Sequence, residues 1–268
     1  MMNKKLLAIV VIAALAAVLV TGFLIQRYSA ESSRASEILT SSKAAVENLE
    51  SLQAEAYFFS SLETQSFTDQ SKYWLHLDLL RTQDEGKKVK LTFENFEYTC
   101  SDPDRYEAYE RLRASLRDAW ILDTSGAFYV YSPMVLNEYV TTFTPQTSLL
   151  RYSYIPIADS LHLALLFDRA ENATYEGIET IEVGNRLIES HVVSYEFSYP
   201  TVRFAEHAKL RTWISAEDYI PVKTELHATS ADDATTINFV FGLTSYEKGV
   251  LIPRETVSIP EGIGIIQR

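Results

Sequence analysis

The hydrophobic residues of this chain form one long apolar run near its start, followed by many short segments with helical or alternating spacing. The run, Leu6 to Ile25, is about 20 residues long and contains no charge, with Lys4 and Lys5 before it and Arg27 after it. A helix of that length, at about 1.5 Å per residue, spans a hydrocarbon core of about 30 Å. The pattern predicts an N-terminal signal anchor, one transmembrane helix, within residues 1–27.

The residues around the run indicate its orientation and fate. Lysines just before it favour a cytoplasmic N-terminus, which places the rest of the chain outside the cell membrane in a single-pass arrangement. The alternative is a cleaved signal peptide, whose apolar stretch is about 7 to 15 residues long and ends at a small-x-small site. The nearest candidate site, Tyr28-Ser29-Ala30, has a bulky Tyr where a small residue is required. The pattern favours a retained anchor, and cleavage stays open.

After a short polar link over residues 28–33, the periodicity indicates a helix and then a series of strands. Apolar positions recur at helical spacing from Ser33 to about Leu52, which predicts an amphipathic helix beside the membrane or a stalk that continues the anchor. The period then becomes two, as in half-buried strands. The predicted strands cover residues 54–62, 73–80, 89 onward, 120–122, 128–131, 139–143, 175–183, 186–199, 209–214, 222–228, 236–243 and 250–259.

Turn and cap residues separate these elements. Asp84-Glu85-Gly86 and Gly184-Asn185 predict hairpin turns. Asp102-Pro103 predicts the start of a second helix, and the apolar segment Ile157 to Phe167 predicts a short buried helix. Roughly ten strands and three helices without a dividing linker predict one α+β domain over residues 34–268, built on a predominantly antiparallel sheet.

Charge narrows the range of partners. The chain has 24 Lys and Arg against 36 Asp and Glu, and three of the basic residues lie within the first 27 residues, which contain no acid. The part beyond residue 27 therefore has 21 basic and 36 acidic residues and a net charge of −15. Such a surface argues against nucleic acid or anionic lipid headgroups as partners.

Residues that carry recognisable chemistry are sparse. Cys100 is the only cysteine, so an intramolecular disulfide is excluded, and we interpret it as a small core residue. The five histidines lack the spacing of a helical metal site, and no motif of a hydrolase, phosphate loop or dinucleotide site is present. We predict no enzymatic activity, no metal and no cofactor. Whether the sequon at Asn172 is glycosylated is left open.

Several stretches resemble a known family. They are Ala35 to Leu39 at the opening of the helix, Leu122 to Pro133, the hairpin Glu179 to Val193, and above all Trp213 to Glu225, which reads WISAEDYIPVKTE. In this order they resemble the LolA-like family of periplasmic lipoprotein carriers, outer-membrane lipoprotein-sorting proteins and mycobacterial lipid-binding lipoproteins. The family usually has an acid after the Trp-Ile pair, where this chain has Ser215.

The resemblance implies a strongly curved antiparallel β half-barrel, with helices plugging its concave face and an apolar cavity between them. Strand alternation nominates five residues of its wall, each with ordinary core packing as the alternative role: Phe58, Leu77, Tyr129, Tyr131 and Trp213. The gating arginine of the carriers corresponds to no position that the sequence identifies.

A fixed membrane helix is incompatible with a soluble shuttle. The expected function is therefore membrane-tethered, extracytoplasmic binding of a lipid, a lipoprotein or another apolar ligand. The alternative is an envelope sensor or protein–protein interaction domain without a bound ligand, whose outer surface contacts another envelope protein. The same fold serves several roles, so the fold alone does not decide between them.

Overall fold

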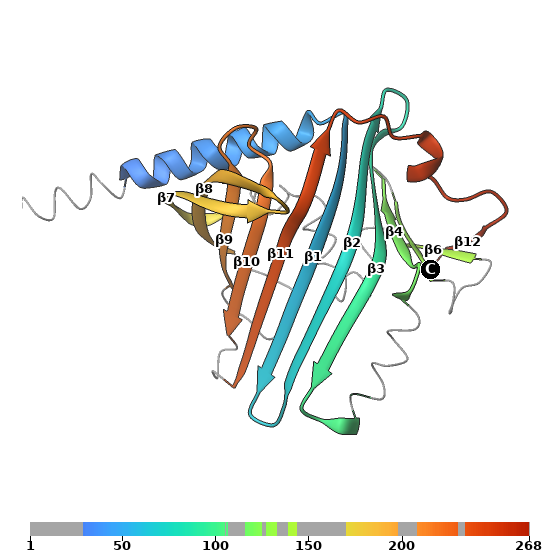
Figure 1. Ribbon diagram of the computed structural model, residues 1–268, viewed down its shortest axis with the longest axis horizontal. Coiled ribbons are helices and arrows are strands. Elements are labelled where there is room, and N and C mark those ends of the chain that lie inside the picture. Colours follow the sequence, from blue (N-terminus) through green and yellow to red (C-terminus); the bar gives the residue numbers. More distant parts are fainter. Residues whose placement is uncertain are drawn as a thin grey trace, which may run out of the picture.

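The computed structural model describes residues 29–104, 106, 116–124, 127–132, 139–143, 170–197, 208–229 and 234–267. In this part of the chain, one large sheet packs against an α-helix over residues 29–47 (Figure 1). No helix within these ranges is both long enough and apolar enough to cross a bilayer. The predicted anchor, Leu6 to Ile25, and the predicted buried helix, Ile157 to Phe167, lie outside the described residues.

The sheet consists of two meanders that meet along β1 and β11. Its spatial order is β12-β6-β5-β4-β3-β2-β1-β11-β10-β9-β8-β7. All neighbouring pairs are antiparallel except β6 and β12, which run parallel. The strands are β1 (Ser51–Thr64), β2 (Thr68–Thr82), β3 (Gly86–Cys100), β4 (Trp120–Asp123), β5 (Phe128–Tyr131), β6 (Tyr139–Phe143), β7 (Glu171–Val183), β8 (Arg186–Phe197), β9 (Ala208–Ser215), β10 (Pro221–Thr229), β11 (Thr235–Lys248) and β12 (Gly264–Gln267).

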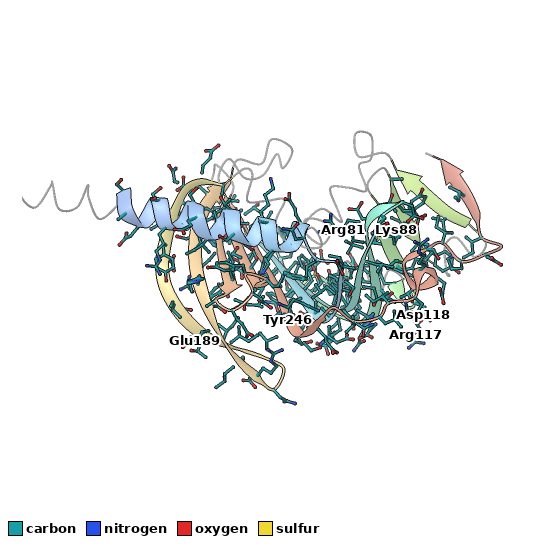
Figure 2. All side chains as sticks on the ribbon, turned by 90° about the horizontal axis from the view of Figure 1, so that it is seen from above. Arg81, Lys88, Arg117, Asp118, Glu189 and Tyr246 are labelled. Carbon is teal, nitrogen blue, oxygen red and sulfur yellow. The ribbon has the colours of Figure 1, made fainter. Side chains whose placement is uncertain are left out.

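The side chains of the sheet divide between two faces. One, which we call the helix face, carries Ala56, Leu75 and Phe93 in register on β1, β2 and β3, all buried. The other, the outer face, carries the intervening side chains, such as Glu55 and His76. Seen from above, the sheet bends toward the side on which the helix lies (Figure 2). The large, mostly antiparallel sheet was predicted correctly, and its bend is consistent with a curved half-barrel.

The helix of residues 29–47 packs on the helix face through one apolar stripe. Ala35, Ile38 and Leu39 are buried against Leu210 and Ile214 of β9 in a shared core cluster. This spacing of three and four residues aligns side chains along one side of a helix. In Figure 1 the helix runs across the ends of β8 to β10.

The outer face is covered at both ends of the sheet. At one end, the segment after β11 packs Ile252 and Val257 against Trp120 and Leu122 of β4. At the other end, the β7–β8 hairpin bends over the sheet toward β11. The tip residue Gly184 lies so close to Thr244 that an added Cβ would meet the carbonyl oxygen of that residue at 2.4 Å.

The structure corrects the predicted elements near the C-terminus. Residues 250–259 were predicted as a strand, but they form an irregular segment with a 3-10 helix, η2 (Arg254–Val257). Pro253 and Pro260 lack the N–H that a ladder needs, and the apolar side chains of the segment cover the outer face instead. Conversely, β12 was not predicted from the sequence, and it forms an edge strand beside β6 among the described strands.

The boundaries of the first helix also differ from the prediction. It ends at residue 47, and Leu52, assigned to the helix by its spacing, belongs to β1. Leu52 fits both patterns because it is three residues from Leu49 and also in phase with Ala54. Residues 29–33, predicted as a polar link, are helical, since they contain no Gly or Pro to end the helix.

The start of the second predicted helix is confirmed. The side chain of Asp102 accepts a hydrogen bond from the N–H of Asp104 at 3.0 Å, as an N-cap does, and Pro103 takes the first helical position. Residues 107–115, which make up most of this predicted helix, lie outside the described residues.

Candidate functional site

A row of aromatic rings crosses the helix face from β11 to β3. In sheet register, Phe58 lies opposite Tyr73, and Tyr73 lies opposite Phe96. The ring centroids of these two pairs are 6.0 and 4.7 Å apart. The row continues on one side to Phe239, 5.6 Å from Phe58, and on the other side to Tyr98, 6.2 Å from Phe96. These separations are typical of interacting aromatic pairs, so the rings form one continuous surface.

A β-bulge makes this row possible. In the pairing of β2 with β3, Trp74 pairs with Asn95 and Leu75 with Phe93, which leaves Glu94 as an extra residue. Strict alternation would send Phe93 and Phe96 to opposite faces, because an odd number of positions separates them. Because Glu94 is an extra residue, Phe93 and Phe96 lie on the same face, and both rings contact Tyr73.

The rings differ in exposure along the row. Phe58 and Phe96 are each 4% exposed, whereas Tyr73, Tyr98 and Phe239 are partly buried at the margin of the core. Tyr106, whose ring lies 6.1 Å from that of Tyr98, is 42% exposed. The row therefore leads from the buried core to the surface.

Polar groups lie at the Tyr98 end of the row. Asp69, which is buried, and Cys100 face each other in register beside the pair Ser71 and Tyr98. Burial, followed by the contacts with Asp69 and Cys100, raises the pKa of the Tyr98 hydroxyl far above its usual range. The hydroxyl is therefore neutral at physiological pH, and it lies beside the Asp69 carboxyl at this end of the row.

The five wall residues nominated from the sequence do not share a face. Phe58 and Leu77 both lie on the helix face, where Leu77 is 1% exposed in the aliphatic part of the core. Tyr129 and Tyr131 lie on the outer face, opposite Leu122 and Trp120 in register, and the Tyr131 ring stacks on Trp120 at 5.3 Å.

Trp213 also lies on the outer face, where it joins the β7–β8 hairpin to the sheet. It is 2% exposed, and its indole Nε1 donates a hydrogen bond to Glu179 Oε2 at 2.8 Å. The Arg211 guanidinium and the Lys223 ammonium each lie 4.5 Å from the indole ring centroid. Arg211 also pairs with Glu176 and Glu179 at 2.7 and 2.6 Å. The hydrogen bond from Trp213, followed by that from Arg211, lowers the pKa of Glu179.

The sequence reasoning missed the other rings of the row. Tyr73 alternates with Leu77 in the same predicted strand, so the sequence already indicated that the two side chains share a face. Phe96 and Tyr98 come after the bulge, which breaks the alternation of β3. Phe239 reaches Phe58 only because β11 pairs with β1 across the whole domain.

A groove of about 530 Å³ lies over β7 to β11, and its lining combines charged residues with the apolar residues Leu210, Leu226 and Phe239. Side chains of both charges line it, including Glu176, Glu196, Lys209, Arg211, Glu225 and His227. Among the described residues this groove does not match the apolar cavity that the family resemblance implied. The aromatic row on the helix face is the feature with matching chemistry.

The strand arrangement has counterparts among solved structures. An uncharacterized conserved protein from Thermus thermophilus is 11% identical with a TM-score of 0.44, over 87% of this chain and 98% of that one. A putative outer membrane lipoprotein-sorting protein domain from Vibrio parahaemolyticus is 11% identical with a TM-score of 0.39, over 84% and 96% of the two chains.

A LolA superfamily protein from Nitrosomonas europaea is 12% identical with a TM-score of 0.34, over 84% of this chain and 97% of that one. Two of these similar structures thus have names that belong to the family that the sequence resembles. Similarity at 11 to 12% identity does not assign a ligand or an activity to this chain. No protein-family model and no curated protein of similar sequence matches it.

Proposed function

We propose that this protein is a membrane-tethered, extracytoplasmic domain that binds a lipid, the acyl chains of a lipoprotein or another apolar ligand along the aromatic row. The row itself is the observation that carries the proposal: rings from β11, β1, β2 and β3 form one apolar surface with a surface-exposed end at Tyr106. The apolar run Leu6 to Ile25 supports the tether.

The physical basis is the transfer of methylene groups out of water. Burial of one methylene is favourable by about 0.8 kcal/mol, so ten methylenes against flat rings contribute about 8 kcal/mol before the costs of association. Rings offer this surface without hydrogen-bonding demands of their own.

Photo-crosslinking in native membranes tests the ligand. Cells would be fed a fatty acid with a photoreactive group in its acyl chain, and crosslinked peptides of the full-length protein would be mapped by mass spectrometry. We expect adducts at Tyr73, Tyr98 and Phe239, and strong loss of them in Phe239→Asp, which places a charge in the row. Tyr131→Asp on the outer face is the matched control. Adducts confined to residues 1–28, or equal in both variants, would reject the proposed site.

The tether and location have their own test. We expect the mature protein to begin at its encoded N-terminus, to sediment with membranes through alkaline washing, and to lose its domain to protease added outside the cell membrane. A mature N-terminus at or after Gly22 would contradict a stationary binding protein and favour a soluble carrier.

A protein-interaction role is the second candidate, and one observation favours it. The β7–β8 hairpin presents two exposed apolar side chains, Ile178, 54% exposed, and Leu187, 77% exposed. Crosslinking of the full chain in membranes distinguishes the two functions, since a specific envelope protein bound at this hairpin, without lipid adducts on the aromatic row, would favour interaction over ligand binding.

A further inference from the structure

Three side chains from adjacent strands converge on the outer face, on the side of the sheet away from the aromatic row. They are Glu55 of β1, His76 of β2 and Glu94 of β3, and one donor atom from each lies within 4.8 Å of the other two. Glu55 and His76 are directly opposite in register. All three are accessible, Glu94 most of all, so an ion can reach them from solvent.

Glu94 reaches this cluster because it is the extra residue of the β3 bulge. Bulges re-aim side chains and concentrate at functional positions. Here the bulge brings Glu94 beside His76 without removing Phe93 and Phe96 from the helix face.

The imidazole of His76 is held in a fixed orientation. Its Nδ1 lies 2.6 Å from Glu55 Oε1, and its Nε2 lies 3.3 Å from Asp78 Oδ2. The Asp78 side chain is only 5% exposed and accepts a hydrogen bond from Gln53 Nε2 at 3.0 Å. A buried carboxylate on one ring nitrogen, with the other nitrogen directed at acidic ligands, is the arrangement that orients metal-binding histidines.

The electrostatic surroundings favour a cation at this place. The carboxylates of Glu55 and Asp78 lie 2.6 and 3.3 Å from the two ring nitrogens of His76, so negative charge surrounds the imidazole. Lys90 lies opposite Asp78 in register and is a cation on the same face of the sheet. The carboxylates gathered around His76 favour a divalent cation at this place.

We propose that Glu55, His76 and Glu94 bind a divalent first-row transition metal ion, for which zinc is the best-suited probe. One imidazole and two carboxylates are ligands that zinc accepts, and three protein ligands leave a fourth position open. Ligand atoms about 2.1 Å from a tetrahedral ion lie about 3.4 Å apart, so only side-chain rotations are required. Asp78 acts as a positioning residue through His76.

Zinc titration of the full chain tests the proposal. The untagged protein, purified in detergent and stripped with a chelator, is titrated with zinc chloride by isothermal calorimetry, and zinc-edge absorption spectra report the ligands. We expect one ion per chain with a single imidazole among its ligands. His76→Gln and Glu94→Gln should weaken binding at least tenfold, and Asp78→Asn about tenfold to 100-fold, as for other orienting partners.

Matched controls distinguish zinc binding at this site from unspecific attraction of zinc to the acidic surface. Glu97→Gln removes an exposed carboxylate of β3, and His227→Gln removes another histidine of the outer face; both should leave zinc affinity unchanged. If His76→Gln fails to fold by circular dichroism, the exposed Glu94→Gln decides alone. The proposal is overturned if the wild-type protein binds no zinc below about 100 μM, or if Glu94→Gln binds as tightly as wild type.

Discussion

At the scale of single residues, the role of a side chain depends on contacts that lie outside its own segment. Trp213 was nominated from the sequence as a residue of the cavity wall. In the structure its indole is enclosed between Arg211, Lys223 and Glu179. The Trp213 side chain therefore holds the β7–β8 hairpin against β9 and β10. The indole serves as a structural joint.

The joint makes a prediction for stability. Trp213→Ala should lower the free energy of unfolding by about 3 to 5 kcal/mol, because it leaves a large void, whereas Trp213→Phe should cost less since most of the apolar volume stays. Urea unfolding of the protein followed by circular dichroism measures both. Trp74→Phe, at a partly buried indole on the same face, should be milder than Trp213→Phe, and a reversed order would contradict the joint.

The raised pKa of His76 makes a second prediction, for pH dependence. A pKa that is higher in the folded state than in the unfolded state stabilises the protein fully below the unfolded value of about 6.5, and the stabilisation is lost as pH rises through the folded pKa. The contribution comes from Glu55 and Asp78, against the largest opposing effect, burial. His76→Gln should therefore lose more stability at pH 5.5 than at pH 9.

Urea unfolding in the presence of a chelator measures this difference, so that metal does not contribute. A destabilisation by His76→Gln that is equal at both pH values, or larger at pH 9, would show that the pair with Glu55 and Asp78 adds nothing to the folded state. A direct NMR titration of the ring should place its pKa above about 6.5.

At the scale of elements, turn chemistry was legible in the sequence while packing partners were not. Gly86 and Gly184 both have positive φ, 74° and 61°, in the hairpin turns predicted from their neighbours. Asp102 caps the helix that its Asp-Pro sequence predicted. In contrast, residues 250–259 have strand-like alternation but pair with no strand. Their apolar side chains pack on the outer face of β4 instead.

The hairpin tip provides a third prediction. Gly184→Ala should destabilise the protein by more than the usual cost of about 1 to 3 kcal/mol for a strained backbone, because its Cβ would also collide with the Thr244 carbonyl oxygen at 2.4 Å. Gly249→Ala is the matched control, since its φ is 70° but open space surrounds its Cβ position. Thermal unfolding should separate the two, and equal losses would mean that the tip does not rest on β11.

At the scale of the whole molecule, the pairing of β1 with β11 unites the two halves. Strands about 180 positions apart in sequence form one ladder, so the central strands β2, β1 and β11 have neighbours on both sides, while β7 and β12 are edges among the described strands. This arrangement places the aromatic row on one face and the Glu55, His76 and Glu94 cluster on the other.

Hydrogen exchange should reflect this order. We expect the amides of β1, β2 and β11 to exchange slowest, near the rate of global unfolding, and those of β7 and β12 to exchange much faster, because edge strands open locally at lower cost. Mass spectrometry of the exchanged full chain measures this by peptide. Equal protection at the centre and at both edges would contradict a single sheet joined through β1 and β11.

The sequence by itself determined the local features of this protein. Alternation identified most strands, and Gly and Asp-Pro positions identified turns and a cap, because these signals depend on nearest neighbours and on backbone sterics. The apolar run and the acidic remainder likewise come from composition, and they predict a membrane anchor with an external domain. The α+β class followed from the same patterns.

Only the tertiary structure decided which side chains meet. Alternation divides a strand into two faces but does not say which one turns inward, and a single bulge at Glu94 reverses the answer for the rest of β3. Phe58 and Leu77 therefore share the helix face, while Tyr129, Tyr131 and Trp213 lie on the outer face. The histidine spacing likewise showed no metal site, because the proposed ligands come from three strands and are assembled by register alone.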